Sequence, residues 1–301
     1  MTNPTIYYAA HMHDWAKNKN WQPYWTERVA ENLHGKSVIK YLFDKGAIAI
    51  AFDDIHCWNP ESYTLPQGRS AIKYMNALDE GSDAWVFARY NIEGESRVLV
   101  GRPKRNSKCF LGEHLFGVGD RSLPIKLLFL EKKYWEVAES DFPLVFRLGP
   151  PFATLVKWNS VQKTAISFVT KKPLDLSDPG SYLPWAIEVL CEEYLRLKGH
   201  LNRKIYKCGG TLKDFDIVGL NSNGQPVFAQ IKNTSRPQDL APFENLPEGS
   251  CQYYFQVSPK FRKKPHPRGS IIFFDIKEVL ETLCGTEGGS EYLKILANGG
   301  V

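Results

Sequence analysis

The chain has 301 residues, of which 43% are hydrophobic and 24% charged, the proportions of a globular protein with room for two ordinary domains. It has no apolar run long enough to cross a bilayer and no secretory pattern at its N-terminus, so we expect a cytoplasmic protein without a membrane partner. The six cysteines are scattered without a CxxC pair, which argues against a zinc site and disulfides. The net charge of +5 permits a nucleic-acid partner without requiring one.

The first half of the chain predicts short helices and strands in an α+β arrangement. Residues 21–46 are expected to be helical in their middle and to end at Gly46, and the apolar run Ala47–Phe52 is expected to form a buried strand. A helix is expected around Ala71–Leu78. The β-rich segments that follow are Ala84–Asn91 and Ser96–Pro103, joined by a turn at Glu93-Gly94-Glu95, and then residues 125–137 and 143–148.

A change of pattern near residue 180 predicts the domain boundary. Residues 171–181 are rich in proline, serine, aspartate and glycine, which is typical of a linker. We therefore expect domains at 1–170 and 182–301. The second domain begins with an amphipathic helix ending at Gly199, and its expected strands are 215–220, 226–233, 251–258 and 270–275, before a closing helix at 276–285.

The first two of these strands carry a polar constellation. The Asn223-Gly224 pair predicts a hairpin between them. Asp216 lies in an otherwise apolar strand, and Gln230 and Lys232 flank Ile231 at strand spacing, so their side chains share a face. Asp214 competes with Asp216, but Asp214 falls outside the apolar run. A hairpin whose lysine only reaches to solvent is the structural alternative.

This set of residues suits metal-assisted hydrolysis of a phosphodiester. A hard cation such as Mg²⁺ takes oxygen ligands, which Asp216, the Gln230 side chain and the Ile231 backbone carbonyl offer. Such a cation neutralises charge on the phosphate and activates water. Lys232 can orient that water and stabilise the developing charge. A glutamate from the preceding helix would complete the ligand set.

The pattern Asp216-(x)13-Gln230-x-Lys232, on a hairpin that follows a helix and the segment GGTLKDFDIVGL, resembles the Mrr-like branch of the PD-(D/E)xK nucleases. The resemblance covers residues 182–280 and implies a restriction-endonuclease-like αβββαβ core. It also implies Mg²⁺, for which Mn²⁺ can substitute, and Glu188 as the helix ligand because of its spacing from Gly199. Glu192, one turn along, is the alternate ligand.

Basic residues near the hairpin are candidate contacts to the DNA backbone, although each is also compatible with plain solvated surface. One group precedes the hairpin and the other forms a run interrupted by prolines. They are Lys204, Lys207 and Lys213, and then Lys260, Arg262, Lys263, Lys264 and Arg268.

The first domain resembles EVE-like domains of the PUA superfamily, which implies a partial barrel. The resemblance rests on the strand Ala47–Phe52 and the closing segment Leu155–Asn159, although Ala51 and Phe52 stand where glycine and tryptophan are usual. Such domains hold a flipped, modified base between aromatic rings. The candidate pocket residues are Trp21, Trp25, Trp58 and Trp85, each alternatively a core residue, and Asp53, which alternatively only ends the strand.

Together these features predict a modification-dependent restriction endonuclease that acts on double-stranded DNA in defence against foreign DNA. A homodimer is expected, since cutting both strands needs two active sites. Two alternatives remain open. One is a nuclease-fold DNA-binding protein that does not cut, and the other is a nuclease effector whose first domain senses a small molecule or a protein.

Overall fold

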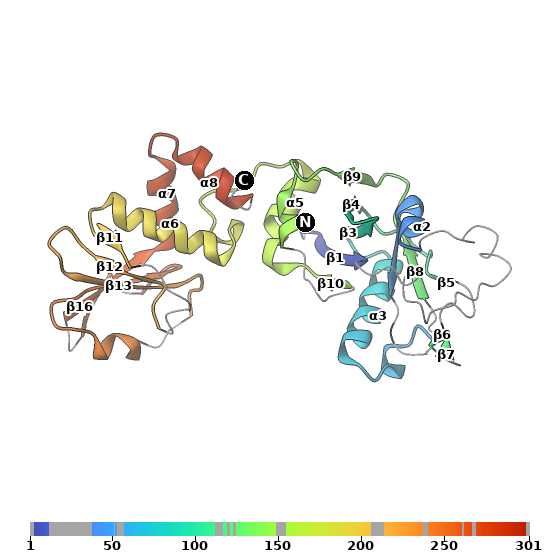
Figure 1. Ribbon diagram of the computed structural model, residues 1–301, viewed down its shortest axis with the longest axis horizontal. Helices are drawn as coiled ribbons and strands as arrows, with labels where there is room; N and C mark the ends of the chain where they lie inside the picture. The colour runs from blue at the N-terminus through green and yellow to red at the C-terminus, as the bar shows by residue number, and fades with distance from the viewer. Residues whose placement is uncertain are drawn as a thin grey trace. The chain divides into compact units, whose positions relative to one another are not determined.

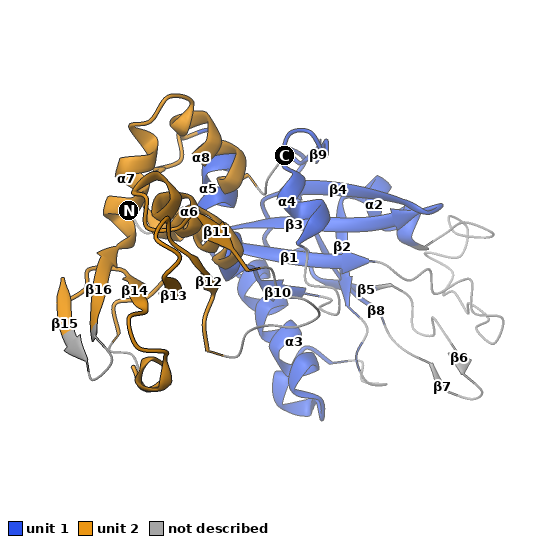
Figure 2. Cartoon of the chain, turned by 60° about the vertical axis from the view of Figure 1, so that its left-hand side comes forward, with its two compact units in different colours: residues 1–171 blue, residues 172–301 orange. Residues whose placement is uncertain are grey.

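The computed structural model divides the chain into two compact units, Met1–Lys171 and Lys172–Val301 (Figure 2). It describes residues 3–11, 38–50, 52, 57–111, 117–118, 121–122, 125–148, 155–205, 214–236, 240–260, 262–266 and 269–298. The division lies one residue beyond the end of the first domain predicted from sequence. Both units mix helices and strands (Figure 1).

Unit 1 is built on a five-stranded sheet in the order β10-β1-β3-β4-β9. Its strands β1 and β3 run parallel, and the other neighbours are antiparallel. A second sheet has the order β2-β8-β5, and β6 pairs with β7. The bounds are β1 (Thr5–His11), β2 (Ala47–Ile50), β3 (Ala84–Ile92), β4 (Glu95–Gly101), β5 (Cys109–Leu111), β6 (Gly117–Val118), β7 (Arg121–Ser122), β8 (Ile125–Phe129), β9 (Trp135–Val137) and β10 (Leu155–Lys157).

Helices cover both faces of the five-stranded sheet. The main core joins α2 (Val38–Lys45) and α3 (Pro66–Asp79) to β2, β8 and one face of β3. On the other face, Phe87 lies 5.5 Å from Phe142 and 6.2 Å from Phe168, measured between ring centroids. Phe142 precedes α4 (Pro143–Arg147), and Phe168 belongs to α5 (Gln162–Thr170). Short 3₁₀ turns stand at η2 (Pro60–Ser62) and η3 (Asn159–Val161).

One predicted strand of unit 1 is wrong. Residues 143–148 were expected to be β-rich, but they form α4. Pro143 occupies the start of this helix, where a missing backbone N–H costs nothing and the fixed φ favours the helical turn.

Unit 2 begins within the segment that the sequence predicted to be a linker. Leu174 and Leu176 pack against the core of unit 2. The Tyr182 hydroxyl donates to the Leu176 carbonyl at 2.7 Å, and Asp178 caps the turn η4 (Pro179–Ser181) by accepting from the Gly180 N–H at 2.9 Å. The apolar leucines therefore bind this proline-rich segment to the second unit.

The sheet of unit 2 has the order β11-β12-β13-β14-β16-β15. The central strands β13, β14 and β16 are parallel, and both edges are antiparallel. The helices α6, α7 and α8 contribute to one core with one face of this sheet, and η5 covers part of the other. The bounds are α6 (Pro184–Leu197), β11 (Arg203–Lys204), β12 (Ile217–Leu220), β13 (Pro226–Lys232), η5 (Ala241–Asn245), β14 (Cys251–Gln256), β15 (Lys263–His266), β16 (Gly269–Asp275), α7 (Ile276–Cys284) and α8 (Gly289–Ala297).

The expected sequence of one helix, four strands and a closing helix is present as α6, β12, β13, β14, β16 and α7. The predicted αβββαβ order is not observed, because the described residues between β14 and β16 contain the edge strand β15 rather than a helix. Prolines 259, 265 and 267 interrupt this connection and disfavour a helix. Part of the predicted basic loop is therefore the strand β15, Lys263–His266. Its lysines and proline are typical of edge strands. No described helix has the length and apolar character to span a membrane.

Candidate functional site

Two neighbouring strands of unit 2 place Gln230 and Tyr254 in one row, and Asp216 lies beside it. Strand β12 pairs with β13 as far as Ile217 opposite Ala229, and Asp216 stands just before this last pair. Strand β13 pairs with β14 so that Gln230 is opposite Tyr254. Directly opposed residues share a face of the sheet. The alternating burial of β13 turns Ile231 into the helix-covered core, so the row lies on the face opposite α6.

Asp216 lies where β12 begins and the two strands separate. Its backbone N–H donates to the Ala229 carbonyl at 3.0 Å. Its Oδ2 accepts from the Ile231 N–H at 2.7 Å, replacing the backbone partner that a longer β12 would supply. Within the described part of the chain, the second carboxylate oxygen has no hydrogen-bond partner. Asp216 is therefore held in place by one oxygen, and the other remains available to a ligand.

The electrostatic influence of Asp216 extends to both faces of the sheet. Burial raises the pKa of the Cys191 thiol on α6, and the nearby carboxylates of Asp216 and Glu188 raise it further. On the other face, burial raises the pKa of Tyr254 to about 12, and Asp216 adds to the rise. Asp216 thus lies close enough to both faces to affect a thiol on one and a hydroxyl on the other, and Glu188 acts on the same thiol.

Gln230 and Tyr254 carry buried polar atoms without hydrogen-bond partners, Gln230 Oε1 and the Tyr254 hydroxyl. A buried acceptor left unpaired costs about 1–3 kcal/mol, so such atoms call for a ligand or water. A side-chain carbonyl oxygen is a fitting ligand for a hard cation. The orphaned Gln230 oxygen is therefore of the chemical type that a hard cation such as Mg²⁺ binds.

Lys232 stands in a second row, one step beyond the first on the same face. The parallel register places it beside Gln256, which is beside Asp275. Gln256 donates to the Arg236 carbonyl at 3.2 Å, and Asp275 caps α7 by accepting from the Lys277 N–H at 3.0 Å. This row is at the carboxyl ends of parallel strands, where α/β sheets bind ligands.

The two helix glutamates have different surroundings. The Glu192 carboxylate accepts from Arg196 at 2.9 Å and from the Lys204 ammonium. These hydrogen bonds lower the pKa of Glu192 against the opposing effect of its burial, which is the largest single influence. Both carboxylate oxygens of Glu192 are therefore paired with cations. Glu188 is half-buried one turn earlier on α6, across the sheet from Gln230.

The candidate DNA contacts fall into three groups. Lys204 pairs with Glu192, and Arg262 pairs with Glu278, with one of its two bonds at 2.7 Å. Lys260, Lys263 and Lys264 are exposed. Because β15 is the sheet edge opposite β11 and β12, the last two are about 19 Å from β12, taking about 4.8 Å per strand. Lys207, Lys213 and Arg268 lie outside the described residues.

The structure separates the two candidate pocket tryptophans that it describes. Trp58 packs against the main core of unit 1 and lies 5.2 Å from the Phe110 ring. Trp85 projects from the opposite face of β3 and lies 5.6 Å from the Trp135 ring. A single pocket containing both is therefore excluded, because the sheet lies between them. Trp21, Trp25 and Asp53 lie outside the described residues.

Sequence reasoning missed Tyr254 and Gln256. The signal was present in CQYYFQ, where Gln252, Tyr254 and Gln256 alternate with apolar residues at strand spacing. Among the described residues, no three His, Cys, Asp or Glu side chains gather as a metal site. The row described above has an amide and a backbone carbonyl as further oxygen donors, which such a grouping does not include. The chain matches no family model, no curated protein and no solved structure.

Proposed function

We propose that unit 2 is a Mg²⁺-dependent nuclease. The observation that carries the proposal is the orphaned buried oxygen of Gln230, which neighbours Ile231, the residue that holds Asp216, with Lys232 on the same face as Gln230. Asp216, the Gln230 side chain and the Ile231 carbonyl would hold the ion, and Glu188 is left out of this set because α6 lies across the sheet from Gln230. When bound, the ion would neutralise phosphate charge and lower the pKa of a water nucleophile.

The residues of the chain have distinct tasks in this proposal. Ile231 fixes the Asp216 carboxylate through its N–H, so that carboxylate is oriented before any ligand arrives. Lys232 orients the attacking water and stabilises the charge that develops on the phosphate. The Tyr254 hydroxyl is protonated at neutral pH, as any tyrosine is, and burial raises its pKa further to about 12, so it can donate a hydrogen bond to a water or phosphate in the site.

For the entire chain we propose a modification-dependent restriction endonuclease that acts as a homodimer on double-stranded DNA in the cytoplasm. Unit 1, as a PUA/EVE-like recognition domain, would read the modified base. The separation of Trp58 from Trp85 restricts a described aromatic pocket to one side of its sheet. Flipping a base costs a few kcal/mol, of which stacking on one ring recovers about 1–3 kcal/mol.

Cleavage of matched duplexes tests the recognition part of this proposal. Unmodified, cytosine-methylated and hydroxymethylated duplexes of one sequence are incubated with the full chain in Mg²⁺, and in EDTA as a control. Cutting confined to one modified duplex is expected. Equal cutting of all three would remove the modified-base role and leave the nuclease, and binding without cutting in Mg²⁺ and Mn²⁺ would favour a silent DNA-binding protein.

A further inference from the structure

Two segments of unit 1, each carrying exposed cations, pair beside the end of β4. We call Arg102–Lys108 and Glu131–Tyr134 together the basic surface. The Lys104 N–H donates to the Phe129 carbonyl and the Glu131 N–H donates to the Arg102 carbonyl, both at 2.8 Å. Pro103 and Leu130 form an antiparallel bridge between them. Segments that are about 25 residues apart in sequence therefore lie side by side.

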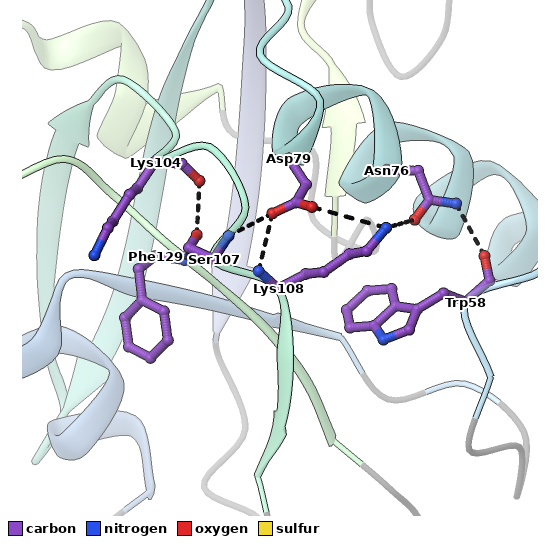
Figure 3. Close-up of polar contacts among 7 residues, drawn as sticks. All are labelled: Trp58, Asn76, Asp79, Lys104, Ser107, Lys108 and Phe129. Carbon is purple, nitrogen blue, oxygen red and sulfur yellow. Dashed lines mark hydrogen bonds and ion pairs between the residues drawn. The ribbon is translucent and has the colours of Figure 1, made fainter.

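A buried carboxylate fixes the first segment (Figure 3). Asp79, at the end of α3, is 5% exposed. Its Oδ1 accepts from the Ser107 N–H at 2.6 Å and from the Lys108 N–H at 2.9 Å. The Ser107 hydroxyl donates to the Lys104 carbonyl at 2.7 Å and accepts from the Phe129 N–H at 3.2 Å. The loop is thus ordered before it meets a partner, which lowers the entropic cost of binding.

The same network occupies Lys108 and the candidate pocket residue Trp58. The Lys108 ammonium is 3.8 Å from Asp79 Oδ2, 3.2 Å from Asn76 Oδ1 and 5.5 Å from the centroid of the Trp58 ring. Asn76 donates to the Trp58 carbonyl at 2.9 Å (Figure 3). Lys108 and Trp58 therefore belong to the network that orders the loop. The other cations of the basic surface are exposed to solvent.

The exposed charges of the basic surface and its immediate surroundings are predominantly positive. They comprise five cations on the two segments and three carboxylates, Glu80, Asp83 and Glu131. Arg102 pairs with Asp83 at 3.0 Å, and Arg105 donates to the Gly81 carbonyl at 3.0 Å. In the part of the chain that the structure describes, the other three cations have no ion-pair partner; they are Lys104, Lys132 and Lys133.

An aromatic pair borders Arg102. The Arg102 guanidinium carbon lies 5.0 Å from the centroid of the Trp85 ring, and the Trp85 ring meets the half-buried Trp135 ring edge to face. A surface that combines three unpaired lysines with an arginine beside a half-exposed ring fits a nucleic acid, whose phosphates bind cations and whose bases stack on rings. An acidic protein would satisfy only the charges.

We propose that the basic surface of unit 1 is a second nucleic-acid interface, which binds the phosphate backbone through Lys104, Lys132 and Lys133 beside the Trp85 ring. This interface does not depend on cleavage by unit 2, because phosphate contacts need no metal. It gives unit 1 affinity for nucleic acid of any sequence, on which base recognition can be added.

Binding of a labelled duplex to the full chain in EDTA tests this interface. Fluorescence anisotropy is measured over a series of salt concentrations for wild type, for Lys132→Glu/Lys133→Glu and for the control Lys157→Glu/Lys163→Glu. The control reverses two exposed lysines on β10, at the opposite sheet edge from β9, and on α5. Both doubles change the net charge equally. We expect the first double to weaken binding at least about tenfold and to reduce the salt slope by about 2, and the control to do neither.

Three results would overturn the proposal. The first is equal loss in both doubles, which would mean that only total charge matters. The second is wild-type binding and an unchanged salt slope in Lys132→Glu/Lys133→Glu. The third is displacement of the duplex by poly-glutamate as readily as by unlabelled duplex, which would mean a general polyanion surface. Because the assay contains no metal, each result is independent of whether unit 2 cuts DNA.

Discussion

A pair of substitutions separates the structural role of Asp216 from the catalytic role that we propose for it. Asparagine retains an oxygen that can accept from the Ile231 N–H, whereas alanine does not. We expect Asp216→Asn to change the free energy of unfolding by less than about 1 kcal/mol and Asp216→Ala to cost about 1–3 kcal/mol. Both should reduce Mg²⁺-dependent cleavage at least about 100-fold. Urea unfolding and cleavage rates check this prediction, and an Asp216→Asn protein that cuts at the wild-type rate would limit Asp216 to a structural role.

Gln230 should illustrate a conflict between stability and activity. Its side-chain oxygen is buried without a partner, so Gln230→Leu removes an unsatisfied acceptor and should leave the free energy of unfolding unchanged or raise it by about 1 kcal/mol. The same change removes an oxygen ligand and should abolish cleavage. Gln230→Glu keeps the ligand and should retain cleavage. Full activity in the leucine variant would contradict the assignment of Gln230.

His11 should make unit 1 sensitive to acid. Its side chain is buried, neither ring nitrogen has a hydrogen-bond partner, and burial lowers its pKa to about 3. An unfolded histidine binds a proton near pH 6.5, so between about pH 3 and 6.5 the unfolded state binds more protons than the folded state. Stability is therefore complete above this window and falls as the pH drops.

The expected slope from this one residue is about 1.4 kcal/mol per pH unit at its steepest. Urea unfolding of wild type and His11→Phe at pH 4.5, 5.5 and 7.5 measures it. The phenylalanine variant should lose less stability than wild type between the two ends of the series. Parallel pH profiles for the two proteins would contradict the burial of an uncharged His11.

At the scale of elements, Asp79 holds the loop at residues 104–108 against the end of α3. Alanine at this position leaves the Ser107 and Lys108 N–H groups without their acceptor and Lys108 without its carboxylate. We expect Asp79→Ala to cost about 2–4 kcal/mol in the free energy of unfolding. Asp44→Ala is the matched control, because the Asp44 carboxylate pairs with Lys40 at the exposed surface and its loss should cost less than about 0.5 kcal/mol. Comparable losses in the two variants would contradict the role of Asp79.

Elements with strong local signals could be predicted from the sequence. Glu93 and Gly94 have positive φ values of 56° and 94° in the turn between β3 and β4, and Gly224 has a φ of 76° between β12 and β13. Both turns were expected from their residues. The strand β1 and the helix α5 were not predicted, because β1 is defined by parallel pairing with β3, nearly 80 residues away.

The candidate site also has a part that local sequence patterns predict and a part that depends on long-range pairing. Strand alternation alone placed Gln230 and Lys232 on one face, and the expected hairpin brought Asp216 near them, where its Oδ2 accepts from the Ile231 N–H. Tyr254 joins this row only through the parallel register of β13 and β14, which no local pattern specifies. The commitment of Glu192 to Arg196 and Lys204 likewise depends on β11, which the sequence did not predict. Long-range pairing is thus the part that sequence reasoning could not supply.

At the scale of the whole molecule, the chain combines a unit with a polar row suited to a hard cation and a unit with an ordered basic surface. The two proposals can fail separately, since one requires a divalent metal and the other does not. If both hold, DNA affinity should decrease with salt for every duplex, whereas cleavage should require Mg²⁺ and the intact row.

The most direct test is Mg²⁺-dependent cleavage by wild type beside Asp216→Asn and Lys232→Ala, on a mixture of unmodified and cytosine-modified duplexes. Anisotropy in EDTA shows that all three proteins bind. We predict cutting by wild type in Mg²⁺, none in EDTA, and none by either variant despite retained binding. Equal cutting by wild type and both variants, or cutting that persists in EDTA, would contradict a metal-dependent site built on Asp216, Gln230 and Lys232.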